Sequence, residues 1–431
     1  MPSYQWITYV QARQALAARL ADPTNAFWSD AENGLYLIEA LRTWSAFTEQ
    51  WNTYFPFAAS AAPVWYNMGS MAGSPRLRTL TDVYLYTLME YHLLEPATGA
   101  TWTGTSQFSI PDLSGALQRR RDEMIQATGC NVWPIGLPST PNTRRQVFTD
   151  SSLEPRRARW IPTTGNPVTM NREDNMAWDG FESNHLQTTG QPANWGVVAG
   201  PPLSFDVDVA PNVSGAYELL SLQSGFPFNP PAVTLMGVPD DWAWLAKWGA
   251  LADLLGRESE ATDRQRADWC LKRYQDGLKA MKNANWLLLA TINGIPVNTP
   301  SVREMDGFSP EWQNNALAWP SVVTAGMDLL APCPVPSTTI GVSCTLVGNQ
   351  PVPVLDTDFV QISRDQFDVV LDYAQVLACF KMGGAEFAAT KDLEANFYAL
   401  ALATNKRLAT LGLFRDMLGL EGRKQDIAQP R

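Results

Sequence analysis

Helical segments with apolar faces occur near the beginning, in the middle and at the end of this chain. The longest stretch, Asp365 to Leu418, contains two amphipathic helices separated by Gly383-Gly384. An early helix covers Ser29 to Trp51, and a middle helical region covers Pro239 to Lys282. An amphipathic helix is stable only when its apolar stripe packs against another element. We therefore expect one helical core that is built from distant parts of the chain.

Capping residues and apolar spacing place the individual helices. Ser29 to Glu32 forms a predicted capping box, in which the Ser hydroxyl and the Glu carboxylate satisfy the first free amides. The helix that follows carries one apolar stripe, made of Leu37, Leu41, Trp44 and Trp51. Pro239 begins another helix, because proline suits the first turn and the next carboxylates favour the positive end of the helix dipole. Its partner starts at Thr262-Asp263, and shorter helices are expected over 10–20, 81–92 and 111–128.

The segments between the helices have the composition of strands and turns. Helical periodicity nearly vanishes from Cys130 to Pro239, where Gly, Pro, Asn and Thr are frequent. Period-two alternation predicts strands in several places, namely Arg156–Pro162, Leu203–Val209, Ala216–Gln223, Asn285–Val297 and Thr338–Val347. Asn171 to Trp178 is expected to be a short helix. The sequence therefore predicts an α+β fold, a discontinuous α-helical bundle core with β-rich insertions.

The same pattern gives the domain boundaries. Residues 1–130 form the N-terminal helical part of the core, and 131–238 form a β-rich insertion domain. Residues 239–283 are a helical hairpin of the core, and 284–363 are a second β-rich segment. The core is completed by the long C-terminal helices at 364–420, which are followed by a polar tail at 421–431.

Composition limits the classes of function. The net charge of −11 disfavours tight binding to nucleic acid phosphates, which needs clustered Lys and Arg. The short basic clusters are expected to be solvated or inter-subunit charges: Arg119-Arg120-Arg121, Arg144-Arg145, and Arg156-Arg157 with Arg159. Five cysteines without a metal or redox spacing indicate a reducing compartment. We expect neither a signal peptide nor a membrane span. The 17 Trp residues suit subunit interfaces as well as cores.

Residue patterns that carry chemistry are scarce. The two histidines, His92 and His185, are too few for a metal site with three His ligands, and each is expected to have a packing or polar role. No nucleophile elbow and no phosphate-binding glycine loop occurs. Asp263, Arg264, Arg266 and Asp268 are expected to form a solvated helix face with local ion pairs. We therefore predict no catalytic residues, no cofactor and no metal.

Several segments, taken together, resemble the neck proteins of tailed bacteriophages, which join the portal ring to the tail. The resemblance covers most of the chain and rests on helix-and-aromatic patterns: Trp28–Asn52, Ser151–Trp160, Val238–Leu278, Ile292–Val297, Phe308–Asn314, Leu371–Thr390 and Asn396–Leu408. Proteins of this family are generally smaller and helical, so the β-rich insertions are a departure from the family pattern.

The resemblance implies a head-to-tail adaptor, a structural virion protein of the neck. Its partners would be the portal protein, other neck or tail proteins, and further copies of itself in a dodecameric ring, of about a dozen subunits to match the portal. Double-stranded DNA would pass through the ring without specific binding, and assembly would take place in the bacterial host cytoplasm. The expected portal contact is the end of the chain, with Phe414, Arg415, Leu418, Leu420, Arg423, Lys424 and Arg431.

The sequence leaves two other classes of function open. One is another phage tail or baseplate structural protein. The other is a glycan-binding or glycan-cleaving protein, because Asp206 and Asp208 fall on one face of a predicted strand and glycosidases need only two carboxylates. In that case Trp178 and Trp195 would be candidates for binding a saccharide ring.

Overall fold

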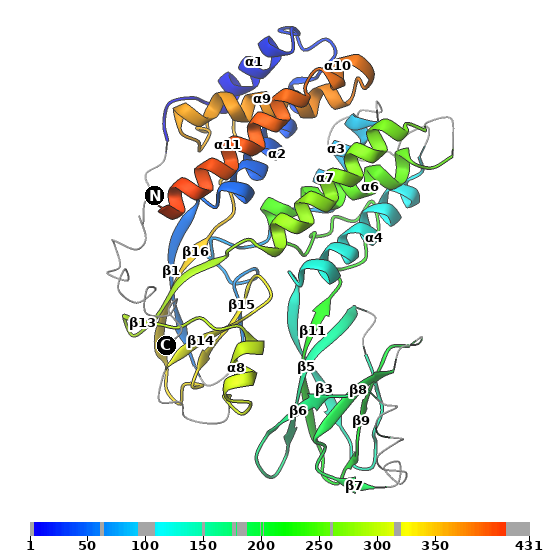
Figure 1. The fold of residues 1–431 in the computed structure, drawn as a ribbon, viewed down its shortest axis with the longest axis vertical. Coiled ribbons are helices and arrows are strands. Elements are labelled where there is room, and N and C mark those ends of the chain that lie inside the picture. Colours follow the sequence, from blue (N-terminus) through cyan, green and yellow to red (C-terminus); the bar gives the residue numbers. More distant parts are fainter. Residues whose placement is uncertain are drawn as a thin grey trace.

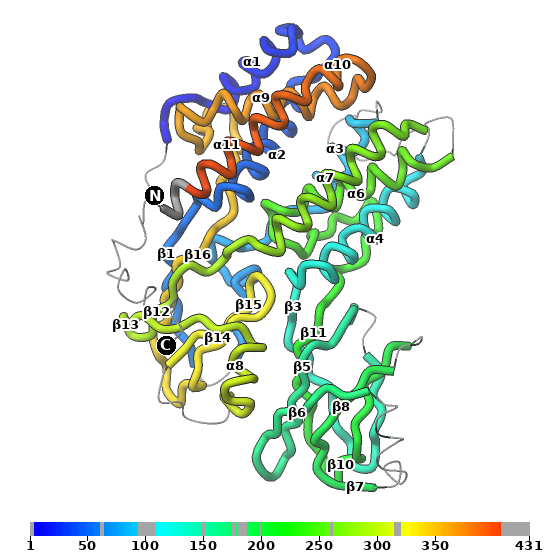
Figure 2. The backbone as a smooth tube through the Cα atoms, in the orientation of Figure 1, coloured from blue at the N-terminus to red at the C-terminus, as the bar shows by residue number. Residues whose placement is uncertain are grey.

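The computed structural model describes residues 4–60, 64–93, 108–148, 151–174, 178, 188–198, 200, 202–258, 262–313 and 320–410. These residues form a mixed α+β structure, so the predicted fold class is confirmed. A helical body occupies one end of the molecule, and two β-rich limbs extend from it side by side (Figure 1). Within the body, the blue helices from near the beginning of the chain lie beside the orange and red helices from near its end (Figure 2).

One part of the helical body combines the beginning and the end of the chain. It contains α1 (Tyr9–Arg19), α2 (Asp30–Thr48), α9 (Arg364–Phe380), α10 (Gly384–Ala388) and α11 (Lys391–Thr410). Helix α2 packs against both α9 and α11, although more than 300 residues separate them along the chain. The turn between α9 and α10 uses Gly383 and Gly384, both with positive φ, which glycine adopts without a steric penalty.

The other part of the helical body comes from the middle of the chain. It contains α3 (Asp82–His92), α4 (Ile110–Thr128), the 3₁₀ turn η2 (Asp240–Trp242), α6 (Trp244–Leu255) and α7 (Arg264–Lys282). Helix α6 lies between α4 and α7 and is buried over almost its whole length. One hydrophobic cluster runs through both helical parts, and it includes Trp44 of α2, Trp248 of α6 and Leu377 of α9. The expected single core from distant segments is therefore present.

The first limb combines the strands after α2 with those from the last third of the chain. Its four-stranded sheet has the order β1-β16-β12-β13, with β1 (Asn52–Ala59), β12 (Leu287–Ile292), β13 (Ile295–Val297) and β16 (Ile340–Val347). A three-stranded sheet of β14 (Ser321–Ala325), β15 (Leu329–Cys333) and β2 (Tyr66–Asn67) lies in the same limb with α8 (Val302–Phe308). Asn293-Gly294, both with positive φ, turn β12 into β13 as a tight hairpin.

The second limb is a nearly closed, barrel-like sheet of seven strands. The strand order is β3-β11-β5-β6-β8-β9-β4, with β3 (Val132–Ser139), β4 (Gln146–Val147), β5 (Ser152–Pro162), β6 (Val168–Arg172), β8 (Asn194–Val198), β9 (Ser204–Val207) and β11 (Gly215–Gln223). Two short strands, β7 (Thr189–Gly190) and β10 (Ala210–Pro211), form a separate parallel pair. The limb has its own core, centred on Trp160, Trp195, Phe205 and Tyr217.

Three of the four edge strands of the two larger sheets contain proline. Pro56 lies in β1, Pro296 in β13, and Pro134 and Pro138 in β3. Proline has no N–H group, so an edge that carries it offers few donors to an additional strand. The fourth edge, β4, has only two residues. These edges are therefore poorly suited to pairing with a strand from another molecule.

Several local predictions need correction. The predicted helix from Asn171 is wrong, because Asn171 and Arg172 belong to β6. The stripe on α2 does not reach Trp51, since the helix stops at Glu49, which adopts a left-handed conformation. Only half of the predicted capping box forms: Ser29 accepts a hydrogen bond from the Glu32 amide, but the Glu32 carboxylate turns inward to Lys381. The predicted strand from Asn285 to Val297 is in fact the β12–β13 hairpin.

Candidate functional site

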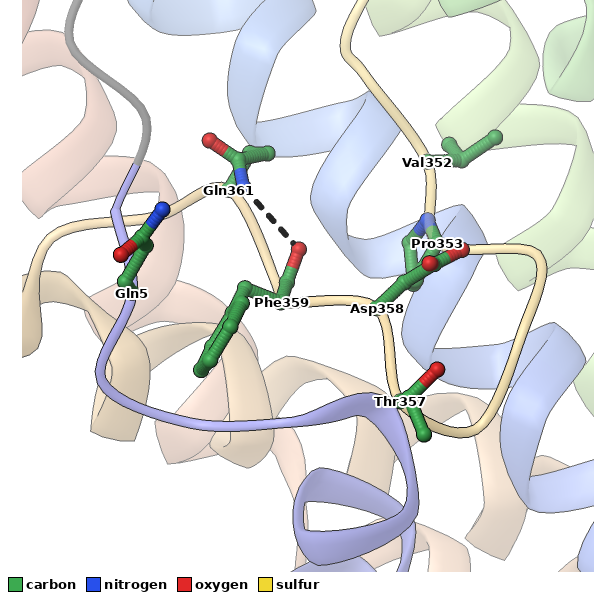
Figure 3. Close-up of a pocket in the computed structure, with 7 residues that line it drawn as sticks. All are labelled: Gln5, Val352, Pro353, Thr357, Asp358, Phe359 and Gln361. Atoms are coloured by element: carbon green, nitrogen blue, oxygen red, sulfur yellow. Dashed lines mark hydrogen bonds between the residues drawn. The ribbon is translucent and has the colours of Figure 1, made fainter.

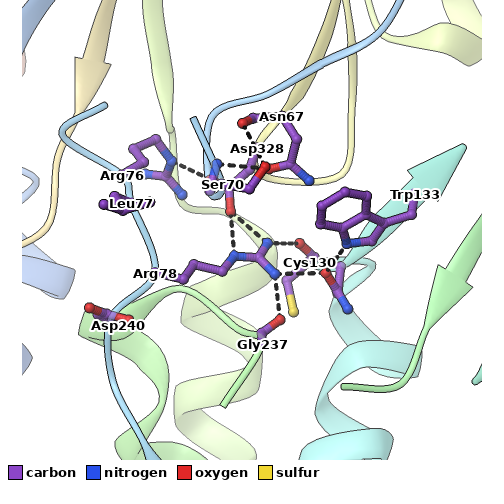
Figure 4. Close-up of polar contacts among 12 residues, drawn as sticks. Asn67, Ser70, Arg76, Leu77, Arg78, Cys130, Trp133, Gly237, Asp240 and Asp328 are labelled. Atoms are coloured by element: carbon purple, nitrogen blue, oxygen red, sulfur yellow. Dashed lines mark hydrogen bonds and ion pairs between the residues drawn. The ribbon is translucent and has the colours of Figure 1, made fainter. Parts of the chain in front are cut away.

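The two limbs and the helical body meet at a buried ionic junction. Asp328, in the β14–β15 hairpin of the first limb, accepts hydrogen bonds from both Arg76 and Arg78 (Figure 4). Arg78 also donates to the carbonyl of Cys130 and the side chain of Asn131, at the start of the second limb. Burial opposes ionisation of Asp328, but the two arginines more than compensate and lower its pKa. One guanidinium thus links segments from both limbs, as its forked geometry allows.

A second set of contacts braces the limbs farther from the body. Arg157 of β5 donates to the carboxylate of Asp306 on α8, at 2.9 Å, and to Gln313 at 2.6 Å. The amide of Thr169 donates to Glu311 at 2.9 Å. Arg157 is buried in this contact, so part of the Arg156–Arg159 cluster holds the two limbs together and is not solvated.

A large cleft lies beside the junction. It has a volume of about 1180 Å³, and its walls come from the 69–78 segment, α4, the starts of β3 and β5, and the 223–237 segment. Trp133, Phe226 and Leu235 line it and are exposed. Each polar side chain in its walls already has a hydrogen-bond partner within the chain: Ser70, Arg78, Gln118, Asp122, Asn131, Ser151, Gln223 and Ser224. This junction cleft therefore favours apolar contacts over recognition of a charged molecule.

A second exposed apolar surface lies where the chain enters α9. The residues Val354 to Phe359, here called the apolar turn, expose Val354 (79%) and Leu355 (63%). The N-terminal residues Tyr4 and Trp6 lie beside it and are also exposed. A shallow hollow of about 310 Å³ adjoins the turn, with Thr357, Asp358 and Phe359 on one segment and Gln5 on the other (Figure 3).

The apolar turn is held in one conformation by many hydrogen bonds. The Asp358 carboxylate accepts from the amides of Leu355 at 2.8 Å and Val354 at 2.9 Å, and these contacts lower its pKa. The Asp358 carbonyl accepts from the Tyr9 amide at 2.8 Å, and Arg13 pairs with Asp356 at 2.6 Å. The two exposed aliphatic side chains therefore project from a rigid support, which reduces the entropy lost on binding.

The helical body contains fully buried charges between its two parts. Lys247 of α6 pairs with Glu39 of α2, and the Trp248 indole donates to the same carboxylate at 3.0 Å. His92 of α3 lies 3.1 Å from the Lys247 ammonium. Burial lowers the pKa of Lys247 to about 8, and burial together with Lys247 holds the pKa of His92 well below its usual value. The expectation that His92 packs in the structure is confirmed, whereas His185 lies outside the described residues.

Arg273 of α7 connects the same two helical parts at another place. Its guanidinium donates to Glu394 at 3.3 Å and to the Tyr398 hydroxyl at 2.6 Å, both on α11. Five aromatic rings surround it within 6 Å: Trp244, Trp248, Trp269, Tyr373 and Tyr398. Such cation–π contacts are strongest where water is excluded. Four helices contribute to this cage, so its role is to hold α11 against the body.

The residues named for the glycan alternative have structural contacts. Asp206 is buried and pairs with Arg145 at 3.1 Å. Asp208 accepts from the amide of Ala193 at 3.2 Å. Trp195 is 1% exposed within the second core, and Trp178 is 5% exposed. Neither indole is free to stack on a saccharide, so the prediction that these two residues bind glycan is not supported.

The remaining sequence predictions have mixed outcomes. All seven residues of the expected portal contact, Phe414 to Arg431, lie outside the described residues. Asp263 and Arg266 form the expected local ion pair at the start of α7. Arg121, predicted to be solvated or inter-subunit, is instead fully buried and donates to the carbonyls of Phe226 and Gly225. Arg159 is likewise buried and pairs with Glu218.

The cysteines are all buried free thiols, and burial raises the pKa of each, for example that of Cys130 to about 11. Within the described ranges, no group of three or more His, Cys, Asp or Glu side chains is arranged to hold a metal ion. A search of the same ranges finds no helix that is long and apolar enough to cross a membrane.

No protein family matches the sequence of this chain, and no curated protein matches it significantly.

Proposed function

We propose that this protein is a head-to-tail adaptor, a structural subunit of the neck of a tailed bacteriophage. It would form a ring between the portal and the tail, around the channel through which DNA leaves the head. The observation that carries this proposal is the architecture: a helical body with two rigidly braced limbs, and large apolar surfaces left exposed on different elements. A subunit of a closed ring needs two different lateral surfaces of this kind.

The last described helix supports the proposed contact with the portal. Helix α11 leaves Leu400 and Leu402 exposed on its surface. The sequence beyond Thr410 continues with further apolar residues, including Phe414 and Leu418, before the polar tail. In the proposed arrangement, the portal packs against the end of α11 and the residues that follow it, and the basic residues of the tail, Arg423 and Lys424, contact the rim of that interface.

The charge of the chain suits a DNA channel that does not bind DNA. With a net charge of −11, the average surface repels a polyanion, so DNA would slide through the ring instead of adhering to its wall.

The mass of the protein, alone and mixed with the portal complex of the same virion, tests the proposal. Light scattering or native mass spectrometry should show a ring on the portal with one subunit per portal chain. Binding only to tail proteins would instead assign the protein to the tail. Absence of binding to either would refute the proposed function.

Removal of the last eleven residues, Glu421 to Arg431, tests the portal contact separately. The truncated protein should bind the portal more weakly than the full chain. A variant with the same eleven residues in scrambled order is the matched control for composition and charge. Equal portal binding by the full and truncated chains would remove this tail from the interface.

A further inference from the structure

The apolar turn and the junction cleft both expose large apolar side chains. On the turn, Val354 and Leu355 are 79% and 63% exposed. The cleft is concave, and Phe226 at its wall is 77% exposed. The residues of the turn do not contribute to the walls of the cleft in the same chain. The two surfaces are therefore separate in one subunit, as far as the described residues show.

We propose that the apolar turn of one subunit inserts into the junction cleft of the next copy in the ring. This inference rests on the proposed function and assigns its lateral interface. The occupant of the cleft is a second copy of this chain, with Val354 and Leu355 against Trp133, Phe226 and Leu235. Because the two surfaces differ, the contact is head-to-tail, and its repetition closes a ring when the rotation between copies allows.

The chemistry of the cleft selects an apolar side-chain surface as its occupant. Each polar side chain in its walls already makes a hydrogen bond within the chain, and the exposed side chains Trp133, Phe226 and Leu235 are apolar. An added β-strand is also disfavoured, because the edge strand β3 that lines the cleft carries Pro134 and Pro138. Val354 and Leu355 supply exposed aliphatic side chains on a turn that adds no strand, and the exposed Asp356 beside them pairs with Arg13 of its own chain.

The exposed apolar areas of the turn and the cleft are smaller than a standard protein interface. At about 200 Å² per large side chain, the turn with Tyr4 and Trp6 exposes on the order of 500 Å², and the cleft on the order of 300 Å². A standard protein interface buries about 1,600 Å² in total. The apolar areas of the turn and the cleft together supply about half of this area. Neighbouring subunits should therefore associate weakly in solution and firmly when a portal holds them side by side.

Cysteine crosslinking between subunits tests the proposed contact. Leu355→Cys and Phe226→Cys are made in separate chains, mixed, and treated with a short bifunctional maleimide, both free at high concentration and bound to the portal. The five native cysteines are buried, so the introduced thiols react selectively. Phe308→Cys replaces Phe226→Cys in the control, because Phe308 is similarly exposed on α8 of the other limb.

Crosslinked dimers in the Leu355→Cys and Phe226→Cys mixture, and in neither variant alone, are expected. Crosslinks within Leu355→Cys alone would show a symmetric contact and overturn the inference. A portal-bound ring without crosslinks would also overturn it, while the proposed function would stand. Crosslinks in the free protein without portal binding would support the lateral contact and count against the adaptor function. No crosslinks in either setting would refute the contact.

A pair of single substitutions supplies a second measurement. Leu355→Asp places a charge in the apolar contact, and the protein concentration needed to fill the ring on the portal should rise about tenfold or more. Phe308→Ser, which removes an equally exposed aromatic side chain elsewhere, should leave that concentration unchanged. Equal effects of the two substitutions would contradict the assignment of the turn.

Discussion

The buried pair of Glu39 and Lys247 allows a quantitative test of how the helical body is held together. In Lys247→Met, the Glu39 carboxylate stays buried and keeps only the Trp248 indole as a donor. Breaking a buried ion pair by removing one partner costs about 3–5 kcal/mol, because a buried charge is left uncompensated. We therefore expect Lys247→Met to lower the free energy of unfolding by about 3–5 kcal/mol.

The double variant Glu39→Gln with Lys247→Met separates the charge from the packing. The introduced glutamine amide would keep an acceptor for the Trp248 indole, and the introduced methionine would fill the space of the lysine stem. Replacing both charges of a buried pair is often neutral. The double variant should therefore be at least about 2 kcal/mol more stable than Lys247→Met alone, and the Glu39→Gln single variant completes the cycle that gives the coupling energy.

Urea unfolding at several pH values measures these differences. The loss of stability in Lys247→Met, relative to the parent, should be larger near about pH 9.5 than near about pH 7. In the parent, the pKa of Lys247 is lowered from 10.5 to about 8. Between about pH 8 and pH 10.5, Lys247 binds more protons in the unfolded chain than in the folded one, so the stability of the parent rises with pH. The difference in stability between the parent and Lys247→Met therefore widens over this pH range.

The surface pair of Lys279 and Asp276 provides the control. Lys279 is exposed on α7, and exposed pairs contribute about 0–1 kcal/mol, so Lys279→Met should change stability little at any pH. Two results would refute the reasoning. One is that the Glu39 and Lys247 substitutions change the free energy of unfolding additively, and the other is that the stability lost in Lys247→Met does not depend on pH.

Three further predictions concern packing and the links between parts of the fold. Gly277→Ala should lower the free energy of unfolding, measured in urea, by about 1–3 kcal/mol, because the added Cβ would lie 2.0 Å from a Leu245 methyl carbon. The control is Gly115→Ala on α4, where the nearest neighbouring atom lies at 3.7 Å, and it should raise the free energy of unfolding by up to about 1 kcal/mol. Arg78→Met should lower the free energy of unfolding by about 3–5 kcal/mol and speed proteolysis between the limbs. Arg78→Lys should restore only part of this stability, because a lysine ammonium lacks the forked donors of a guanidinium. Arg273→Met should leave Glu394 short of a partner and increase proteolytic cleavage in α11, while cleavage in α4 stays unchanged.

The helices were predictable because their signals are local. The spacing of Phe367, Val370 and Leu371 gives the buried face of α9 without knowledge of its partner. The same holds for α4 and α7, whose starts agree with the predicted capping positions within a few residues. The discontinuous core also followed from the sequence, since three sets of apolar helix faces needed each other.

The strands and the junction were less predictable for physical reasons. The closure of the second limb depends on pairings such as β5 with β11, and period two alone does not specify a partner. The Asn293-Gly294 hairpin had a readable turn signal that the continuous apolar run concealed. Arg78 looks like an ordinary surface arginine in the sequence, because its acceptors, Cys130, Asn131 and Asp328, lie 52 to 250 positions away.

The positions of proline in the sheets constrain how copies of this chain can associate. An open edge strand normally invites a second chain to add a strand, and that contact has weak control over register. With Pro56, Pro296 and Pro134 on three of the edges of the larger sheets, association through strands is disfavoured at each of them. Among the exposed apolar side chains of the described surface, Leu355 and Phe226 lie on loops. Assembly would then depend on side-chain fit at a few anchored turns, which defines one geometry between neighbours and therefore a ring of definite size.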